Sequence, residues 1–191
     1  SIGDADARSI PLADKTIDLI ITSPPYLNAI DYLRGHKLSL VWMKHSIADI
    51  RKTRSTNIGT AVSAKKSDPN SVIDSVIENI CSGMPLDKRN EGVLRKYLID
   101  LHLFLKECNR VLKQDGKGVF VIGDCNLRNT FISNATAIEL IGLQVGFQVE
   151  TSWRRPLPEN RRYLPPPSSK FSGAALQKRM REEVILKLRK I

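Results

Sequence analysis

The hydrophobic run that organises the chain covers residues 17–21 and leads directly into a proline pair. The run reads Ile-Asp-Leu-Ile-Ile, and Thr-Ser-Pro-Pro-Tyr follows it at residues 22–26. A short apolar run that prolines close is typical of a buried parallel strand ending at a loop. The prolines fix φ, remove two donors and push each preceding residue into an extended conformation, so the loop should be stiff. It would hold a hydroxyl, carbonyls and an aromatic ring where open α/β sheets bind ligands.

The strongest helical pattern covers residues 93–113, where leucines recur close to helical spacing. The glycine-containing stretch 114–118 predicts the end of this helix. Residues 119–122, Val-Phe-Val-Ile, then predict a second buried strand. Strand, helix and strand in this order predict an α/β crossover.

The C-terminal third predicts one more helix and a strand pair. Ser133 or Asn134 can cap a helix that ends at Gly146. Residues 147–153 alternate as a strand does, and residues 183–188 predict a last strand that pairs with it antiparallel. We therefore expect a mostly parallel sheet with an antiparallel C-terminal hairpin.

The segment between the proline loop and residue 92 has the weakest pattern. Asp31 is a good cap for a helix reaching about residue 45, and its apolar stripe predicts that Trp42 lies in the core. Residues 71–81 look like a short amphipathic helix. The rest is polar and basic, which favours a mobile insertion over residues 51–92.

The charge and composition of the chain limit which classes of binding partner and which kinds of site are expected. Thirty Lys and Arg against twenty Asp and Glu give a net charge of +10, which favours a polyanion such as nucleic acid over an ordinary basic protein without such a partner. Three cysteines form no CxxC pair, and three histidines lack metal-ligand spacing, so we predict no metal and no disulfide framework. Free thiols in a reducing cytosol, and no membrane span, are expected.

Three stretches resemble one protein family. Residues 22–42 (TSPPYLNAIDYLRGHKLSLVW), 110–124 (RVLKQDGKGVFVIGD) and 157–166 (LPENRRYLPP) resemble S-adenosylmethionine-dependent, site-specific DNA amino-methyltransferases. The resemblance covers about residues 3–188. It implies that residues 1–191 form one partial, Rossmann-like methyltransferase domain. It also implies double-stranded DNA as substrate, S-adenosylmethionine as cofactor and a role in restriction-modification.

The resemblance assigns the catalytic roles to the proline loop. Ser23, through its side chain, and Pro24, through its carbonyl, would accept hydrogen bonds from the target amine of adenine or cytosine. Pro25 would stiffen the loop, and Tyr26 would stack on the extruded base. No Pro-Cys occupies the loop, which argues against cytosine C5 methylation, since that reaction needs a thiolate.

Binding residues are assigned less directly. In Gly3-Asp4-Ala5-Asp6-Ala7-Arg8, Asp4 or Asp6 could approach the adenine amine of the cofactor. We favour Asp6 for its distance from Pro11-Leu12; the alternative is that both are turn residues. The candidate nucleic-acid-binding residues are Asn28, Arg51, Arg54, Arg155, Arg161, Arg162 and Tyr163. Alternatively, the arginines near residue 160 pair with acids, and the basic loop after residue 50 is only solvated.

The resemblance also marks a gap. The family holds its cofactor with a glycine-rich loop after its first strand, and the sequence contains no such loop. We therefore expect the first strands and that loop to lie upstream or in a second chain. An exposed sheet edge, possible homo-oligomers and weak cofactor binding by this chain alone would follow.

Competing functions remain open. One is an RNA or protein methyltransferase with a similar loop, although those more often carry Asp or Asn where this chain has Ser23. Another is a non-catalytic nucleic-acid-binding or subunit module. Adenine N6 and cytosine N4 both remain candidate targets, with Ser23 leaning toward cytosine.

Overall fold

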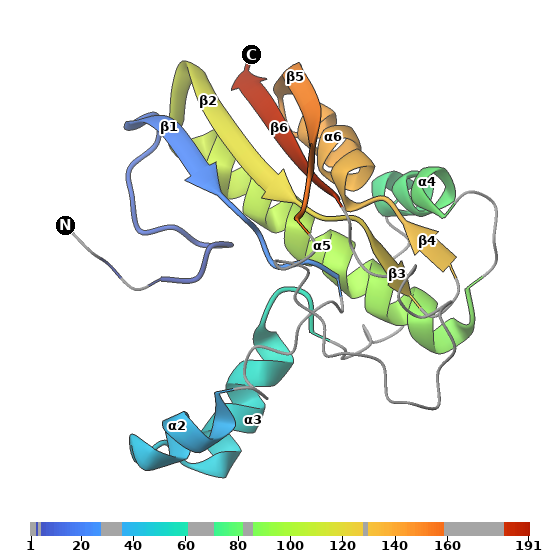
Figure 1. Cartoon of the computed structure of the whole chain (residues 1–191). Coiled ribbons are helices and arrows are strands. Elements are labelled where there is room, and N and C mark those ends of the chain that lie inside the picture. Colours follow the sequence, from blue (N-terminus) through green and yellow to red (C-terminus); the bar gives the residue numbers. More distant parts are fainter. Residues whose placement is uncertain are drawn as a thin grey trace.

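A computed structural model of the chain describes residues 3, 5–27, 36–60, 71–81, 86–127, 130–158 and 182–191. The elements within these ranges form one sheet, one small hairpin and five helices (Figure 1). In chain order they are β1 (Ile17–Thr22), α2 (Lys37–Trp42), α3 (Ile47–Thr56), α4 (Ser71–Ile80), α5 (Lys88–Val111), β2 (Leu112–Ile122), β3 (Cys125–Leu127), β4 (Thr130–Ile132), α6 (Asn134–Gln144), β5 (Phe147–Pro156) and β6 (Glu182–Lys190).

The main sheet has the strand order β1-β2-β6-β5. Only β1 and β2 pair in parallel, while β6 is antiparallel to both β2 and β5. Among the described strands, the expectation of a mostly parallel sheet is therefore wrong. Strand β6 takes a central place because it buries every second residue, whereas Phe147 alone is buried on β5.

The core lies between this sheet and the helices on one of its faces. Helices α5 and α6 lie behind the sheet in Figure 1, and α4 lies beside α6 and packs on it. The 24-residue α5 buries Leu94, Leu98, Leu101 and Leu105 completely. Alternate residues of β2 and β6 point at these helices, and the other face of β1 leaves Ile21 69% exposed.

The junction between α5 and β2 differs from the prediction. The helix ends at Val111 and β2 begins at Leu112, without the predicted turn over residues 114–118. Instead the register against β1 jumps, because Ile17 is opposite Leu112 and Leu19 is opposite Lys117. The intervening residues bulge out of the ladder.

The predicted helix from Asp31 is also corrected where the structure describes it. Helix α2 covers only Lys37–Trp42, and Lys44 has φ 67°, which interrupts the helical path. Ser46 then caps α3 by accepting a hydrogen bond from the Asp49 N–H, so the polar stretch after residue 46 is helical. Trp42 is 89% exposed and not in the core, because the α2–α3 pair lies apart from the sheet (Figure 1).

The remaining elements agree with the sequence except for one hairpin. Helix α4 buries Ile73, Val76 and Ile80, Ser133 caps α6, and β5 and β6 form the predicted antiparallel pair. The sequence pattern did not predict the short hairpin of β3 and β4. All three cysteines are free thiols, as predicted.

None of the described helices combines the length and the apolar character that a membrane span needs. Likewise, the described part of the chain contains no group of three or more His, Cys, Asp or Glu side chains that could hold a metal ion.

Candidate active site

The carboxyl ends of β1, β2 and β5 and the amino end of β6 lie along one edge of the sheet. The carboxyl ends of β1 and β2 lie there because the two strands are parallel. Since β6 is antiparallel to β2, its first residues meet that same edge, and Ile122 is opposite Val184. The end of β5 joins them through the pairing of Arg155 with Glu183. The proline loop thus shares its edge with the last strand of the chain.

The hydroxyl group of Tyr26 links this loop to β6. Its oxygen lies 3.4 Å from Ser23 Oγ, and it donates a hydrogen bond to Glu183 Oε1 at 3.3 Å. The other carboxylate oxygen, Glu183 Oε2, accepts from Arg155 Nη2 at 2.5 Å. The Glu183 side chain is 14% exposed, so this ion pair is shielded on the acid's side. Ser23, Tyr26, Glu183 and Arg155 thus form one connected polar chain.

The loop itself is fixed by burial and by a close backbone approach. Pro24 and Leu27 are buried, and Ser23 is exposed. Gly59, which follows α3, has φ +79°, and a Cβ added to it would lie 3.0 Å from the Tyr26 carbonyl oxygen. Only glycine fits this position without strain. The segment after α3 therefore packs against the backbone of the candidate catalytic loop.

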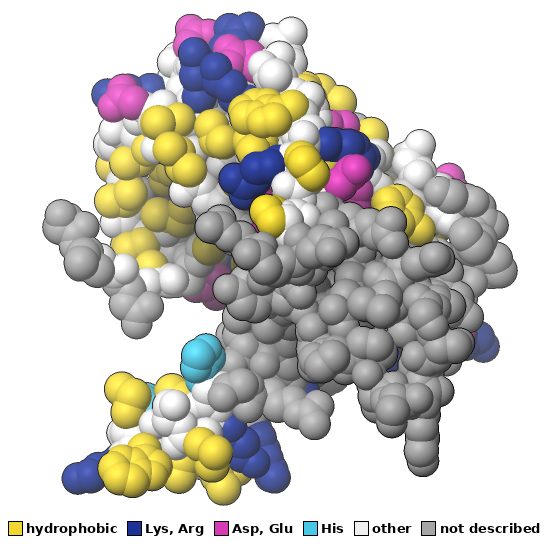
Figure 2. All heavy atoms as spheres, in the orientation of Figure 1, with side chains coloured by type: hydrophobic (Ala, Val, Ile, Leu, Met, Phe, Trp, Pro, Cys, Tyr) yellow, Lys and Arg dark blue, Asp and Glu magenta, His cyan; other side chains and the backbone are white. Residues whose placement is uncertain are grey.

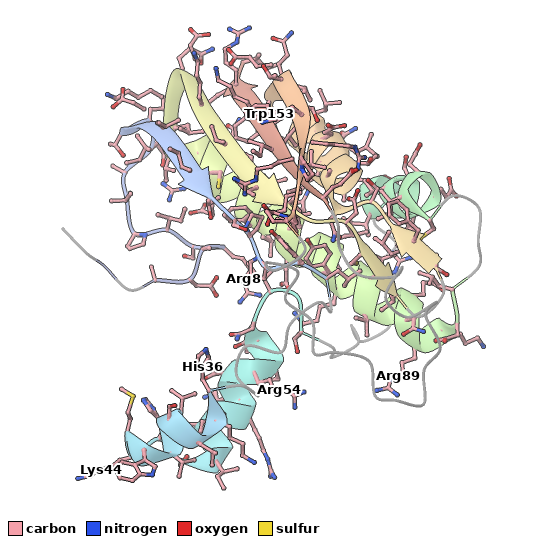
Figure 3. All side chains as sticks on the ribbon, viewed as in Figure 1. Arg8, His36, Lys44, Arg54, Arg89 and Trp153 are labelled. Carbon is pink, nitrogen blue, oxygen red and sulfur yellow. The ribbon has the colours of Figure 1, made fainter. Side chains whose placement is uncertain are left out.

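Asp6, the favoured cofactor residue, is held by Arg8. Asp6 Oδ1 accepts from the Arg8 backbone N–H and Nε, and Oδ2 accepts from Arg8 Nη2 at 2.7 Å. The hydrogen bond from the Arg8 side chain is the main reason that the pKa of Asp6 falls to about 2. Arg8 also donates to the buried Asp100 on α5, which Lys96 contacts at 2.6 Å. This network ties the N-terminal segment to α5, and Figure 3 shows Arg8 below the end of β1.

The arginines near the active edge are already paired. Arg154 lies 3.2 Å from Glu182 and 3.7 Å from Asp124, and Arg155 contacts Glu183. The alternative expectation, that arginines of this region pair with acids, therefore holds for these two side chains. Both remain more than half exposed, so further donors face solvent.

Other predicted DNA contacts fall on α3 or outside the described ranges. Arg51 and Arg54 lie on α3, and Figure 3 shows Arg54 there and Lys44 at the far end of the α2–α3 pair. The predicted residues that lie outside the described part of the chain are Asp4, Asn28, Arg161, Arg162 and Tyr163.

The cysteines offer no activated nucleophile. Burial raises the pKa of both Cys108 and Cys125 to about 12, and it also raises the pKa of Cys81. A thiol with a raised pKa stays protonated near neutral pH. Methyl transfer through a thiolate is therefore disfavoured at this site.

Sequence reasoning missed Glu183, Gly59 and Asp100. Glu183 sits at the start of a strand that was recognised only by its apolar alternation. The strand register, which places it beside the proline loop, is a long-range property. Gly59 carried a signal, because a glycine after a polar run often marks a position with positive φ.

In comparisons with known proteins, the sequence is similar to type II methyltransferases. No protein-family model matches the chain. It is 28% identical over 152 residues to the type II methyltransferase M.AvaI of Nostoc sp. (strain PCC 7120 / SAG 25.82 / UTEX 2576), covering 70% of this chain and 31% of that protein. It is 24% identical over 192 residues to M.MvaI of Kocuria varians, covering 92% of this chain and 41% of that protein. The chain thus spans less than half the length of these relatives.

Solved structures give a weaker likeness. A Thermus thermophilus protein assigned as a DNA modification methylase, complexed with S-adenosyl-L-methionine, has a TM-score of 0.48 at 17% identity, covering 97% of this chain and 51% of that one. The cytosine-N4-specific PvuII DNA methyltransferase has the same TM-score at 14% identity, covering 95% and 45%. At such TM-scores the likeness carries no conclusion. The sequence matches show a similarity instead: over most of its length, the chain resembles the type II methyltransferases M.AvaI and M.MvaI.

Proposed function

We propose that the chain carries the base-binding half of a DNA amino-methyltransferase, which transfers a methyl group to the exocyclic amine of cytosine or adenine. The observation that supports this most is the position of Ser23, Pro24 and Tyr26 on a constrained loop at the carboxyl end of β1. Ligands bind at this end of strands in open α/β sheets. The sequence relationship to type II DNA methyltransferases supports DNA as the substrate.

The chemistry required is stabilisation of a poor nucleophile. The lone pair of the amine is delocalised into the base, so its nitrogen must become tetrahedral as positive charge develops there. Ser23 Oγ and the Pro24 carbonyl are the acceptors for its two N–H groups. Fixed acceptors lower the barrier because they need no reorganisation during the reaction.

Tyr26 provides the stacking surface for the target base. A base that reacts at its amine must leave the duplex, and stacking on an aromatic ring offsets part of that cost. Such stacking contributes ~1 to 3 kcal/mol in comparable aromatic–base contacts. The hydrogen bond that the Tyr26 hydroxyl donates to Glu183 fixes the ring. Less conformational entropy is therefore lost when the base binds.

S-adenosylmethionine is the proposed methyl donor, and it supplies the methyl group from a sulfonium. Asp6 fits a role in holding its adenine amine, because an ionised carboxylate can accept more hydrogen bonds than Arg8 provides. The glycine-rich loop typical of such cofactor sites is lacking in the sequence. We expect this chain by itself to bind the cofactor weakly, and micromolar binding in calorimetry would contradict that expectation.

The proposed DNA-binding residues act through charge. Arg51 and Arg54 on α3, and Arg155 through its exposed donors, would contact phosphates. Arg161, Arg162, Tyr163 and Asn28 keep the same proposed role from the family resemblance. Cytosine N4 is the favoured target because the loop begins with Ser23, and adenine N6 is the alternative.

Transfer of a labelled methyl group to duplex DNA tests the proposal. The full-length gene product should label DNA, and Tyr26→Ala should lower the rate at least about tenfold by removing base stacking. Labelling of tRNA without labelling of DNA would favour an RNA methyltransferase. DNA binding without labelling of either substrate would favour a non-catalytic module.

A further inference from the structure

The direction of hydrogen bonds around Ser23 is set by a carboxylate on the last strand. A hydroxyl group has one hydrogen to donate and two lone pairs, whereas an ionised carboxylate only accepts. Glu183 Oε1 lies 3.3 Å from the Tyr26 hydroxyl oxygen, and Arg155 occupies Oε2. Tyr26 must therefore direct its hydrogen toward Glu183.

This direction determines what Ser23 can offer to a substrate. With its own hydrogen committed, the Tyr26 oxygen acts as an acceptor toward Ser23 Oγ, which lies 3.4 Å away. The Ser23 hydrogen then points at Tyr26, and the Ser23 lone pairs stay available. An amine that has two N–H groups needs acceptors, so this is the productive orientation for the proposed reaction.

We propose that Glu183 and Arg155 are positioning residues, which hold Ser23 as a hydrogen-bond acceptor through the Tyr26 hydroxyl. The proposal rests on the proposed function, since it explains how the serine meets an amine. Both hydroxyl distances, 3.3 and 3.4 Å, are long for O–H···O hydrogen bonds. The Glu183 side chain is 14% exposed, so water competes little for its oxygens.

Glu183→Gln is the sharpest test because the amide differs from the carboxylate only in polarity. Arg155 only donates, so it should retain the amide oxygen and leave the NH2 group facing Tyr26. Tyr26 would then accept a hydrogen bond from the amide and donate one to Ser23, which reverses the direction of both hydrogen bonds. In full-length gene product that methylates DNA, we expect kcat to fall about ten- to hundredfold, the equivalent of one charge-assisted hydrogen bond, with KM for DNA unchanged.

The chain offers a matched control and a route to rescue. Glu182 lies next to Glu183 on β6 and pairs with Arg154 of the same partner strand, so Glu182→Gln removes a similar charge and should leave kcat unchanged. Adding Arg155→Ala to Glu183→Gln frees the amide to turn its oxygen toward Tyr26. Part of the lost kcat should then return.

Tyr26→Phe tests the same path, because it keeps the ring and removes the hydroxyl group. Its effect on kcat should not add to that of Glu183→Gln. Unchanged kcat in Glu183→Gln, additive effects, or an equal loss in Glu182→Gln would overturn the proposal.

A readout without catalysis separates this proposal from the proposed function. The Tyr26 hydroxyl proton, followed by NMR, should exchange slowly in the wild type and in Glu182→Gln, where its acceptor is the shielded Glu183 carboxylate. It should exchange faster in Glu183→Gln, where its acceptor would be the exposed Ser23 hydroxyl. If the wild type methylates neither DNA nor RNA but this pattern holds, the proposed function fails and the hydrogen-bond direction stands. Fast exchange in the wild type would overturn the direction itself.

Discussion

At the scale of single residues, Gly59 sets how closely α3 and the proline loop approach each other. We predict that Gly59→Ala lowers the free energy of unfolding by roughly 1 to 2 kcal/mol, because φ +79° disfavours a side chain and the new Cβ would meet the Tyr26 carbonyl at 3.0 Å. Urea unfolding measures this change. Gly3→Ala is the control, since a Cβ at Gly3 meets nothing within 4 Å, and equal stability of the two variants would contradict the prediction.

Asp6 gives the molecule a pH dependence with a defined sign. Mainly through the Arg8 side-chain hydrogen bond, its pKa is about 2 in the folded protein, against an ordinary value of 3.8. The carboxylate therefore adds stability above pH 3.8, and that stability is lost as the pH falls through about 2.

We predict that Asp6→Asn lowers the unfolding free energy by roughly 1 kcal/mol or less at neutral pH, because the Asp6 side chain is half exposed and solvent screens the pair. The difference from wild type should shrink as the pH falls through about 2, because the Asp6 carboxylate becomes protonated there, and urea titrations at neutral and at acidic pH measure it. A stability difference that persists at low pH would show that the effect of Asp6→Asn does not come from the charge of the carboxylate.

The residues of the proline loop were predictable because they are contiguous in sequence. Ser23, Pro24 and Tyr26 follow an apolar run, and local geometry alone places them at a strand end. Glu183 was not predictable in this way, since 157 residues separate it from Tyr26. Its position depends on which strands β6 pairs with in the sheet.

At the scale of elements, α5 carries the core and its two faces differ sharply. Leu101 is fully buried, and Leu103 on the same helix is 42% exposed. We predict that Leu101→Ala costs about 2 to 5 kcal/mol of unfolding free energy, through lost burial and the cavity left behind. Leu103→Ala should cost less than half as much in the same thermal or urea experiment, and similar losses would contradict the assigned face.

Helix prediction succeeded where a long apolar stripe faced the core and failed where burial was slight. The stripe of α5 gave the position of the helix to within a few residues. In the α2–α3 pair, α2 buries no residue and α3 buries only Ile50, so apolar periodicity carries little information. There the N-cap of Ser46 and the positive φ of Lys44 decide the boundaries.

At the scale of the whole molecule, the excess of positive charge predicts salt-dependent DNA binding. Each phosphate contact adds about 0.9 to the slope of log affinity against log salt. We predict that Arg51→Ala and Arg54→Ala each lower that slope by about this amount, as measured by fluorescence anisotropy with duplex DNA.

Lys113→Ala is the control for this experiment. It removes the same charge, but Lys113 follows Leu112, which is opposite Ile17 at the far end of β1 and β2 from the proline loop. Its slope should match wild type, and an equal decrease would show that only net charge matters.

The uncovered face of β1 predicts self-association. Figure 2 shows hydrophobic side chains gathered over this face, where Leu19 is 50% and Ile21 is 69% exposed. Ile21→Lys should therefore shift the chain toward monomer in sedimentation velocity runs, because the charge opposes burial of that face. An unchanged distribution of species would indicate that other surfaces associate.

The central place of β6 has a consequence for biosynthesis. Strand β6 holds residues 182–190, near the end of this sequence, yet β2 and β5 both pair with it. During translation of this stretch, β5 therefore leaves the ribosome before the strand that joins it to the sheet. Glu183 reaches Tyr26 only after that strand has inserted, so the proposed site can assemble only once residues 182–190 have been synthesised. Until then the unpaired edges of β2 and β5 are open to wrong partners, which makes this interval the point at which a chaperone would help most.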